Sequence, residues 1–241
     1  MDTPNEKKKV LMREGESTPR ICQINRQKFP RNGARGSISE RVGKIAVEFT
    51  QGFELLKKYD LAATFFGSAR TEPGSKVYED AVALARRLSK SGFTIITGGA
   101  AGVMEAANKG AHDAKGQSVG LNINLPEEQM GNDFTTDSEN FHYFFSRKVM
   151  LTFASEVYVY FPGGFGTLDE FFEIVTLVQT KKIEPIPIVL VGKDFWGPLL
   201  EWIEKGLLET HHTISKEDIN MYTLVDSVDE AYTVIMDKVC I

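Results

Sequence analysis

The chain has 241 residues, of which 42% are hydrophobic and 25% charged, and this composition is typical of a globular protein rather than a fibrous or disordered one. Its formal net charge of −5 is unevenly placed, because residues 1–35 carry nine Lys or Arg against four acids, which leaves an acidic remainder. Since an acidic body offers no basic face to a phosphate backbone, nucleic acid is not expected as a partner.

The first segment differs in character from the rest of the chain. Residues 1–38 are polar, basic and interrupted by prolines and glycines, which predicts a flexible extension. From residue 39, apolar residues recur at three- and four-residue steps and predict a helix as far as about residue 59. We therefore expect one domain over residues 39–241.

Short apolar runs alternate with amphipathic stretches through this domain. The expected strands are 61–66, 93–97, 118–123, 157–161, 186–191 and 222–225. The expected helices are 77–91, 103–114, 141–153, 171–180, 196–208 and 227–239, with a polar loop over 124–139. Because continuous apolar strands between helices are typical of a sheet buried on both faces, we predict a Rossmann-like three-layer α/β/α fold with a mostly parallel sheet.

Glycine turns follow three of the expected strands. They are Gly67-Ser68, Gly98-Gly99 and the run Gly163-Gly164-Phe165-Gly166-Thr167. Ligands of parallel sheets bind beyond the carboxyl ends of the strands, so Ser68, Gly98, Gly99 and Gly163 are candidate binding residues. None of the turns has the GxGxxG or GxxxxGK[ST] spacing, and a nicotinamide cofactor or ATP hydrolysis is not supported.

The third turn has the features of an anion site. Its glycines allow positive φ and close approach of a ligand, and the helix expected after it directs N–H groups and a positive dipole end into the turn. Glu170 lies one turn further on, where a carboxylate would repel a bare phosphate but could act on a sugar beside one. Taken alone, Glu170 could equally be a helix-start acid that favours the dipole.

The segment PGGFGTLDE at 162–170 matches the PGGxGTxxE signature of the LOG ("lonely guy") family. The match extends to FFGSAR at 65–70, GGAAGVMEAANKGA at 98–111, NLPEEQ at 124–129 and SRK at 146–148, in this order. Over roughly residues 60–195 the chain therefore resembles this family, whose members are also labelled possible lysine decarboxylases.

The resemblance implies a function. LOG-like proteins hydrolyse the N-glycosidic bond of purine nucleoside 5′-monophosphates, such as AMP or cytokinin riboside monophosphate, to free base and ribose 5-phosphate. It places catalysis on Arg147 and Glu170, and substrate contacts on Glu128, Lys148, Gly164, Phe165, Gly166, Thr167 and Thr176. It also implies a homodimer. The chemistry requires no metal, and we expect no cofactor.

The chemistry of the residues agrees with this resemblance. A carboxylate at Glu170 can stabilise an oxocarbenium-like sugar and orient or deprotonate water, while Arg147 can act on the phosphate or on the departing base. Two alternatives stay open: a nucleotide sensor without catalysis, and a lysine decarboxylase in which Lys148 binds pyridoxal phosphate, although no motif for positioning that cofactor surrounds it.

Cysteine usage and hydropathy bear on location. Cys22 and Cys240 lie at opposite ends with no CxxC spacing, and no His pair has metal-ligand spacing. No apolar run approaches the length of a membrane span, and the first residues lack the apolar core of a secretory signal. We expect a cytoplasmic protein with no membrane partner.

Overall fold

A computed structural model describes residues 38–124 and 131–239 of the chain. The chain divides into two compact units, residues 1–41 and residues 42–241, and the described strands belong to the second. The predicted extension, residues 1–38, lies almost entirely outside the described residues. Among those described, no helix combines the length and apolarity that a membrane crossing requires.

One parallel sheet forms the centre of the second unit. Its strands, within the described residues, are β1 (Ala62–Phe66), β2 (Thr94–Thr97), β3 (Ser118–Ile123), β4 (Asp137–Phe141), β5 (Val157–Tyr160), β6 (Ile188–Val191) and β7 (Tyr222–Val225). They lie in the order β4-β3-β2-β1-β5-β6-β7, and every neighbouring pair is parallel. The predicted α/β class with a mostly parallel sheet is confirmed.

The order of the strands creates a switch point in the sheet. The chain runs outward from β1 through β2 and β3 to β4, then returns to place β5 on the other side of β1. The connection after β1 therefore leads toward β2 on one side of the sheet, and the connection after β5 leads toward β6 on the other side. In such sheets a crevice forms beyond the carboxyl ends of the two strands between which the direction changes.

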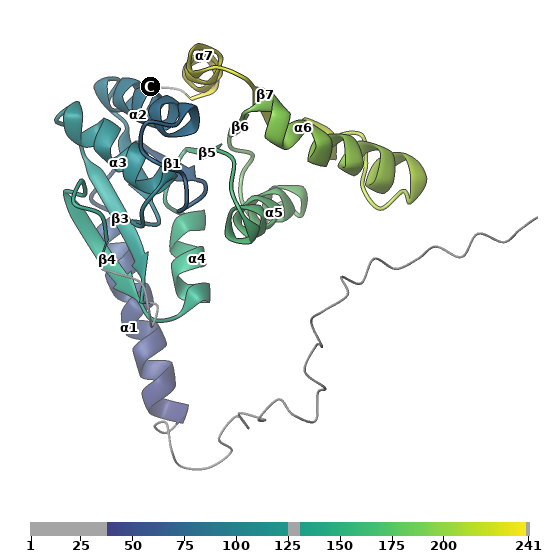
Figure 1. The fold of residues 1–241 in the computed structure, drawn as a ribbon. Helices are drawn as coiled ribbons and strands as arrows, with labels where there is room; N and C mark the ends of the chain where they lie inside the picture. The colour runs from purple at the N-terminus through teal and green to yellow at the C-terminus, as the bar shows by residue number, and fades with distance from the viewer. Residues whose placement is uncertain (1–37, 125–130, 240–241) are drawn as a thin grey trace, which may run out of the picture. The chain divides into compact units, whose positions relative to one another are not determined.

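Helices cover both faces of the sheet (Figure 1). One face is covered by α2 (Lys76–Lys90), α3 (Val103–Asp113) and α7 (Val228–Lys238). The other face is covered by α1 (Ile38–Leu56), α4 (Phe144–Thr152), α5 (Phe165–Gln179) and α6 (Lys193–Trp202). A π-helical segment, Ile203–Thr210, continues α6, and a 3₁₀ turn, Asp218–Asn220, precedes β7. Alternate residues of β1 serve the two cores: Ala63 and Phe65 pack in the first, Ala62 and Phe66 in the second.

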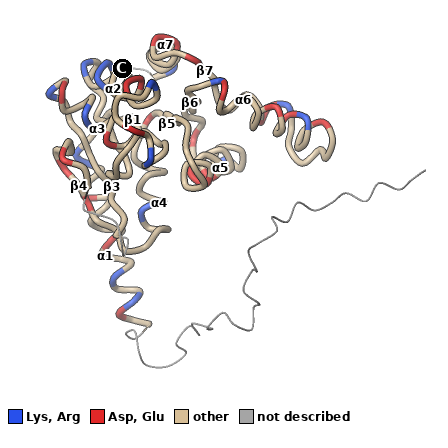
Figure 2. The backbone as a smooth tube through the Cα atoms, viewed as in Figure 1, with Lys and Arg blue, Asp and Glu red and all other residues tan. Residues whose placement is uncertain are grey.

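The edge strand β4 corrects two sequence predictions. The expected polar loop 124–139 ends in β4, and the expected helix 141–153 begins only at Phe144, since Phe141 belongs to the strand. β4 reads DSENF and is an edge strand, and four of its five residues are not buried, so it carries polar residues and lacks an apolar run. The other described strands contain no charged residue, and charges lie on helices and loops (Figure 2).

Helix α5 corrects a third prediction. It begins at Phe165, directly after Gly164, rather than at Phe171 as the sequence indicated. The sequence predicts Gly166 and Thr167 in the turn, because both residues have low helix propensity, but they are tolerated in a first helical turn that packing holds in place. The glycine motif is therefore the start of a helix.

Candidate active site

A large pocket lies at the switch point of the sheet. Its volume is about 1210 Å³, somewhat above the range of about 300–1,000 Å³ that is typical of small-molecule sites. The loop after β1, the turn after β2 and the turn after β5 line it, together with residues of α4 and the side chain of Phe195 on α6. The three glycine turns thus meet in one cavity.

Two glycines of the turn after β2 leave room for charged and polar side chains that line the pocket. A Cβ added at Gly98 would lie 2.0 Å from Nη2 of Arg147, so a side chain at this position would displace the guanidinium. Gly99 has φ of +73°, and a Cβ there would lie 1.7 Å from Oδ1 of Asn122. Its N–H donates to the Thr97 hydroxyl at 2.9 Å, which fixes the turn.

The N-terminus of α5 opens into the pocket without a side-chain cap. The N-cap is Gly164, which has no side chain to accept from the first-turn N–H groups, and the first helical bond runs from Leu168 N to Gly164 O at 3.1 Å. A Cβ at Gly164 or Gly166 would meet nothing within 4 Å, so the helix end faces open space. This geometry suits an anion such as a phosphate.

The expectation of positive φ in this motif is wrong. Left-handed backbone occurs elsewhere, at Gly99 among others, but not at Gly163, Gly164 or Gly166. Gly163 is needed for a different reason: a Cβ there would lie 2.2 Å from the hydroxyl of Thr167. The glycines therefore serve close packing and open access rather than an unusual backbone conformation.

The pocket contains a titratable group with a strongly shifted pKa, the carboxyl of Glu170. It lies in the second turn of α5, partly buried among the pocket residues, and the hydroxyl of Tyr160 donates to its backbone carbonyl at 3.2 Å. Burial raises the pKa of the Glu170 carboxyl to about 7, against the opposing influence of the Arg147 charge. A carboxyl with this pKa can accept or release a proton near neutral pH.

Arg147 enters the pocket from α4. Its Nε donates to the carbonyl of Leu121 at 2.7 Å and its Nη2 to the carbonyl of Gly98 at 3.3 Å. Leu121 lies in the carboxyl-terminal half of β3 and Gly98 directly follows β2, so the guanidinium is fixed to this part of the sheet in the same cavity as Glu170. A cation is thereby held beside the carboxyl and near the helix end.

The pocket brings together most of the candidate residues. Those that line it are Ser68, Gly98, Gly99, Arg147, Gly163, Gly164, Phe165, Gly166, Thr167 and Glu170. Glu128 lies outside the described residues. Lys148 and Thr176 do not line the pocket: the Thr176 hydroxyl donates to the carbonyl of Phe172 at 2.6 Å on the same helix.

Lys148 joins α4 to α5 instead of facing the cavity. Its Nζ lies 2.9 Å from a carboxylate oxygen of Asp169 and 2.9 Å from one of Glu173. These two acids flank Glu170 in the sequence and along the helix, and their charges raise its pKa while Lys148 lowers it. The ion pairs thus set part of the electrostatic environment of the carboxyl.

Other lining residues were not singled out from the sequence. They include Arg70, Glu72, Met104, Asn122 and Phe195. Arg70 follows an expected strand and Asn122 lies next to the last residue of one, and these positions could have marked them, whereas Phe195 reaches the cavity only through the packing of its helix. In the described part of the chain, no three His, Cys, Asp or Glu side chains are grouped as metal ligands would be.

The fold and the pocket define a doubly wound, Rossmann-like α/β protein with a ligand site at the switch point of its sheet. Within that class, the sequence model of the family described as "possible lysine decarboxylase" matches residues 104–235, more than half of the chain. The chain belongs to this family, which is the LOG family named in the sequence analysis.

Two relatives are 27% and 29% identical to the chain over the aligned residues. A cytokinin riboside 5′-monophosphate phosphoribohydrolase of Rhodococcoides fascians is 27% identical over 154 residues, which span 61% of this chain and 76% of the relative. A probable enzyme of the same name from Oryza sativa subsp. japonica is 29% identical over 158 residues, 63% of this chain and 62% of the relative.

Solved structures resemble the fold. The molybdenum cofactor carrier protein of Chlamydomonas reinhardtii superposes with a TM-score of 0.55 at 20% identity, over 74% of this chain and 98% of that protein. At this identity the likeness concerns the fold alone.

Proposed function

We propose that this protein hydrolyses the N-glycosidic bond of purine nucleoside 5′-monophosphates, AMP or an N6-modified AMP such as a cytokinin riboside monophosphate, and releases the base and ribose 5-phosphate. One observation carries the proposal: the Glu170 carboxyl, whose pKa is raised to about 7, shares a pocket with Arg147 and the uncapped end of α5. The names of the family relatives support the same reaction.

The phosphate would bind at the N-terminus of α5. The N–H groups of the first turn and the positive end of the helix dipole stabilise phosphate oxygens, and the open space at Gly164 and Gly166 admits them. Ser68, Gly98 and Gly99 line the cavity nearby and would contact the rest of the nucleotide. The ribose would then be held over the second turn of the helix, where Glu170 lies.

In the reaction, the bond between ribose C1′ and the base nitrogen breaks and its electron pair leaves with the base. The developing oxocarbenium charge on the sugar is stabilised by the Glu170 carboxylate. The same carboxylate accepts a proton from the water whose oxygen forms the new bond to C1′, and that proton passes to the base. Arg147 neutralises phosphate charge or donates a hydrogen bond to the departing base.

Four residues assigned by resemblance take weaker or different roles in this proposal. Phe165, at the mouth of the pocket with 93% of its surface exposed, could flank the substrate. Glu128 and Thr176 are retained as substrate contacts by resemblance alone. Lys148 would act through its ion pairs with Asp169 and Glu173 rather than by touching the substrate.

We also propose that the protein is a homodimer, as the family resemblance implies. Exposed phenylalanines on α4 and α5, the helices that carry Arg147 and Glu170, support this, because large exposed apolar side chains are frequent at interfaces. They are Phe144, Phe145, Phe165 and Phe172. Sedimentation analysis of the purified protein tests the proposal, and a single monomeric species would contradict it.

The direct test of the activity is incubation of purified protein with AMP, followed by chromatography for free adenine and an assay for ribose 5-phosphate. Equal amounts of both products are expected. A sensor would bind AMP and release neither, and a decarboxylase would instead release carbon dioxide from lysine when pyridoxal phosphate is added. Comparing kcat/KM for AMP and for N6-prenylated AMP then identifies the preferred base.

A further inference from the structure

The helix that carries Arg147 has no cap of its own. Tyr143 is the N-cap of α4 and its side chain makes no capping hydrogen bond. Arg147 is the fourth residue of the helix, and its N–H closes the first turn by donating to the Tyr143 carbonyl at 3.2 Å. The placement of the Arg147 backbone, from which the guanidinium extends, therefore depends on the contacts that hold the chain around Tyr143.

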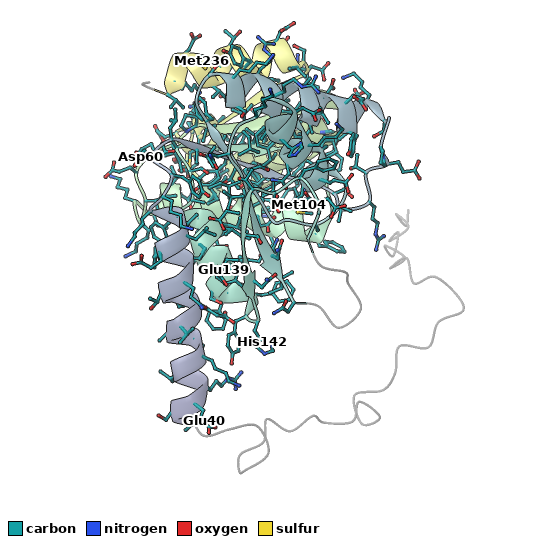
Figure 3. All side chains as sticks on the ribbon, turned by 90° about the vertical axis from the view of Figure 1, so that its left-hand side faces the viewer. Glu40, Asp60, Met104, Glu139, His142 and Met236 are labelled. Atoms are coloured by element: carbon teal, nitrogen blue, oxygen red, sulfur yellow. The ribbon has the colours of Figure 1, made fainter. Side chains whose placement is uncertain are left out.

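A carboxylate from a distant helix caps this end. One oxygen of Glu48, on α1, accepts from the backbone N–H of His142 at 2.8 Å, and the other accepts from the N–H of Tyr143 at 3.3 Å and from the hydroxyl of Ser146. His142 lies beside α1 in Figure 3. A negative charge at this place also favours the dipole of α4.

Close packing fixes the same two helices further along. Gly52 lies one turn after Glu48 on the same face of α1 and is buried. A Cβ there would lie 2.5 Å from Sδ of Met150 on α4 and 3.2 Å from Cζ of Phe141. Met150 and Phe141 are themselves fully buried, so α1 and α4 cannot slide past one another easily.

We infer that Glu48 is a positioning residue for Arg147: its carboxylate on α1 caps α4, sets the rotation and height of that helix, and thereby aims the guanidinium at the pocket. Ser146, whose hydroxyl donates to the Glu48 carboxylate, is buried and directly precedes Arg147. The inference rests on the proposed function, because it assigns Arg147 a part in that reaction.

The hydrogen bonds of the guanidinium itself limit the size of the effect. Arg147 stays tied to the carbonyls of Leu121 and Gly98 when the cap is weakened, so it should shift rather than leave the pocket. A shift on the order of 1 Å in a catalytic group can lower the rate by up to about 100-fold. We expect a loss of about tenfold in kcat for Glu48→Gln, smaller than the loss for Arg147→Ala.

The experiment compares Glu48→Gln with Glu54→Gln, a matched change on the same helix. The Glu54 carboxylate is 60% exposed and paired only with Lys57 among the described residues. Glu48→Gln should lower kcat about tenfold and change the Kd for AMP by less than about threefold, while Glu54→Gln changes neither. Amide hydrogen exchange should also accelerate at residues 144–147 in Glu48→Gln alone.

A double-mutant cycle separates positioning from general stability. In an Arg147→Ala background, Glu48→Gln should cause no further loss of kcat, because the group it positions is absent. A wild-type kcat for Glu48→Gln, or the same loss in both backgrounds, would overturn the inference and leave the proposed function intact. If Arg147→Ala itself kept full activity, the proposed mechanism would fail, and the inference with it.

A second variant covers the case in which Glu48→Gln does not fold. Ser146→Ala removes the hydroxyl that bonds to the Glu48 carboxylate and lies 2.9 Å from the Tyr143 carbonyl, and it keeps a good helix former at that position. It should lower kcat about threefold with AMP binding unchanged, again only when Arg147 is present. An unchanged kcat for this variant would count against the role of the cap.

Discussion

Replacing Glu170 with Gln should make the folded protein more stable at pH 8 while it removes the proposed activity. Burial raises the pKa of this carboxyl from 4.5 to about 7. For the ionised form, a rise of this size corresponds to about 3 kcal/mol of unfavourable free energy in the folded state. Gln has nearly the same shape and never ionises, so the variant avoids this penalty.

The pH dependence follows from the direction of the shift. Below pH 4.5 the carboxyl is protonated in both the folded and the unfolded chain, and wild type and variant should differ little. Between pH 4.5 and about 7 the unfolded chain ionises while the folded one resists, so the wild type loses up to about 3 kcal/mol relative to the variant. Above pH 7 the difference should stay constant.

Urea denaturation of both proteins at pH 5 and pH 8 measures this difference. Other carboxyls shift the stability as well: the pKa values of Asp113 and Asp137 are lowered, chiefly by hydrogen bonds from Lys109 and Lys58, so their contributions are lost in acid. They are present in both proteins and cancel in the comparison. We expect a gain of about 1–3 kcal/mol for Glu170→Gln at pH 8 and under about 1 kcal/mol at pH 5. A variant less stable than the wild type at pH 8, or a gain independent of pH, would refute the reasoning.

Three further substitutions probe the pocket. The kcat/KM for AMP should fall as the pH drops below about 7, because the carboxyl of Glu170, with a pKa of about 7, must be ionised. Lys148→Met should move this acidic limb of the pH profile to higher pH, because it removes a cation that lowers the pKa of Glu170. An unmoved limb would contradict the role of the ion pairs. Gly166→Ala should leave the protein as stable as the wild type or up to about 1 kcal/mol more stable, since alanine favours the helix. It should nevertheless raise the KM for AMP, because the new Cβ occupies the open space at the end of α5. An unchanged KM would count against phosphate binding there. Gly99→Ala should destabilise by at least about 1–3 kcal/mol in urea denaturation, because φ is +73° and the new Cβ would meet Asn122; wild-type stability would refute this.

The sequence was sufficient to predict the buried strands and the edge of the sheet where the pocket lies. β1, β2, β5 and β6 are short continuous apolar runs because both of their faces are covered, and a glycine turn follows each of the first three. β4 escaped prediction because one side of it is a free edge and its residues are polar.

The contacts that define the site are long-range and carry no local signal. Arg147 reaches the carbonyls of Gly98 and Leu121, which are 49 and 26 residues away in the chain, and Glu48 caps α4 across more than 90 residues. The raised pKa of Glu170 depends on burial by surrounding elements, and the pairing of Lys148 on the relative placement of α4 and α5. None of these follows from residue spacing.

The central claim is that Glu170 cleaves a bond in a nucleotide bound mainly by other groups. Adenine release from AMP should be measured in a single turnover for the wild type, for Glu170→Gln and for a control, Glu184→Gln, which changes an exposed carboxylate beyond α5. We predict that Glu170→Gln lowers the rate at least about 100-fold while AMP still binds, and that the control matches the wild type. Adenine release by Glu170→Gln at the wild-type rate would contradict the account.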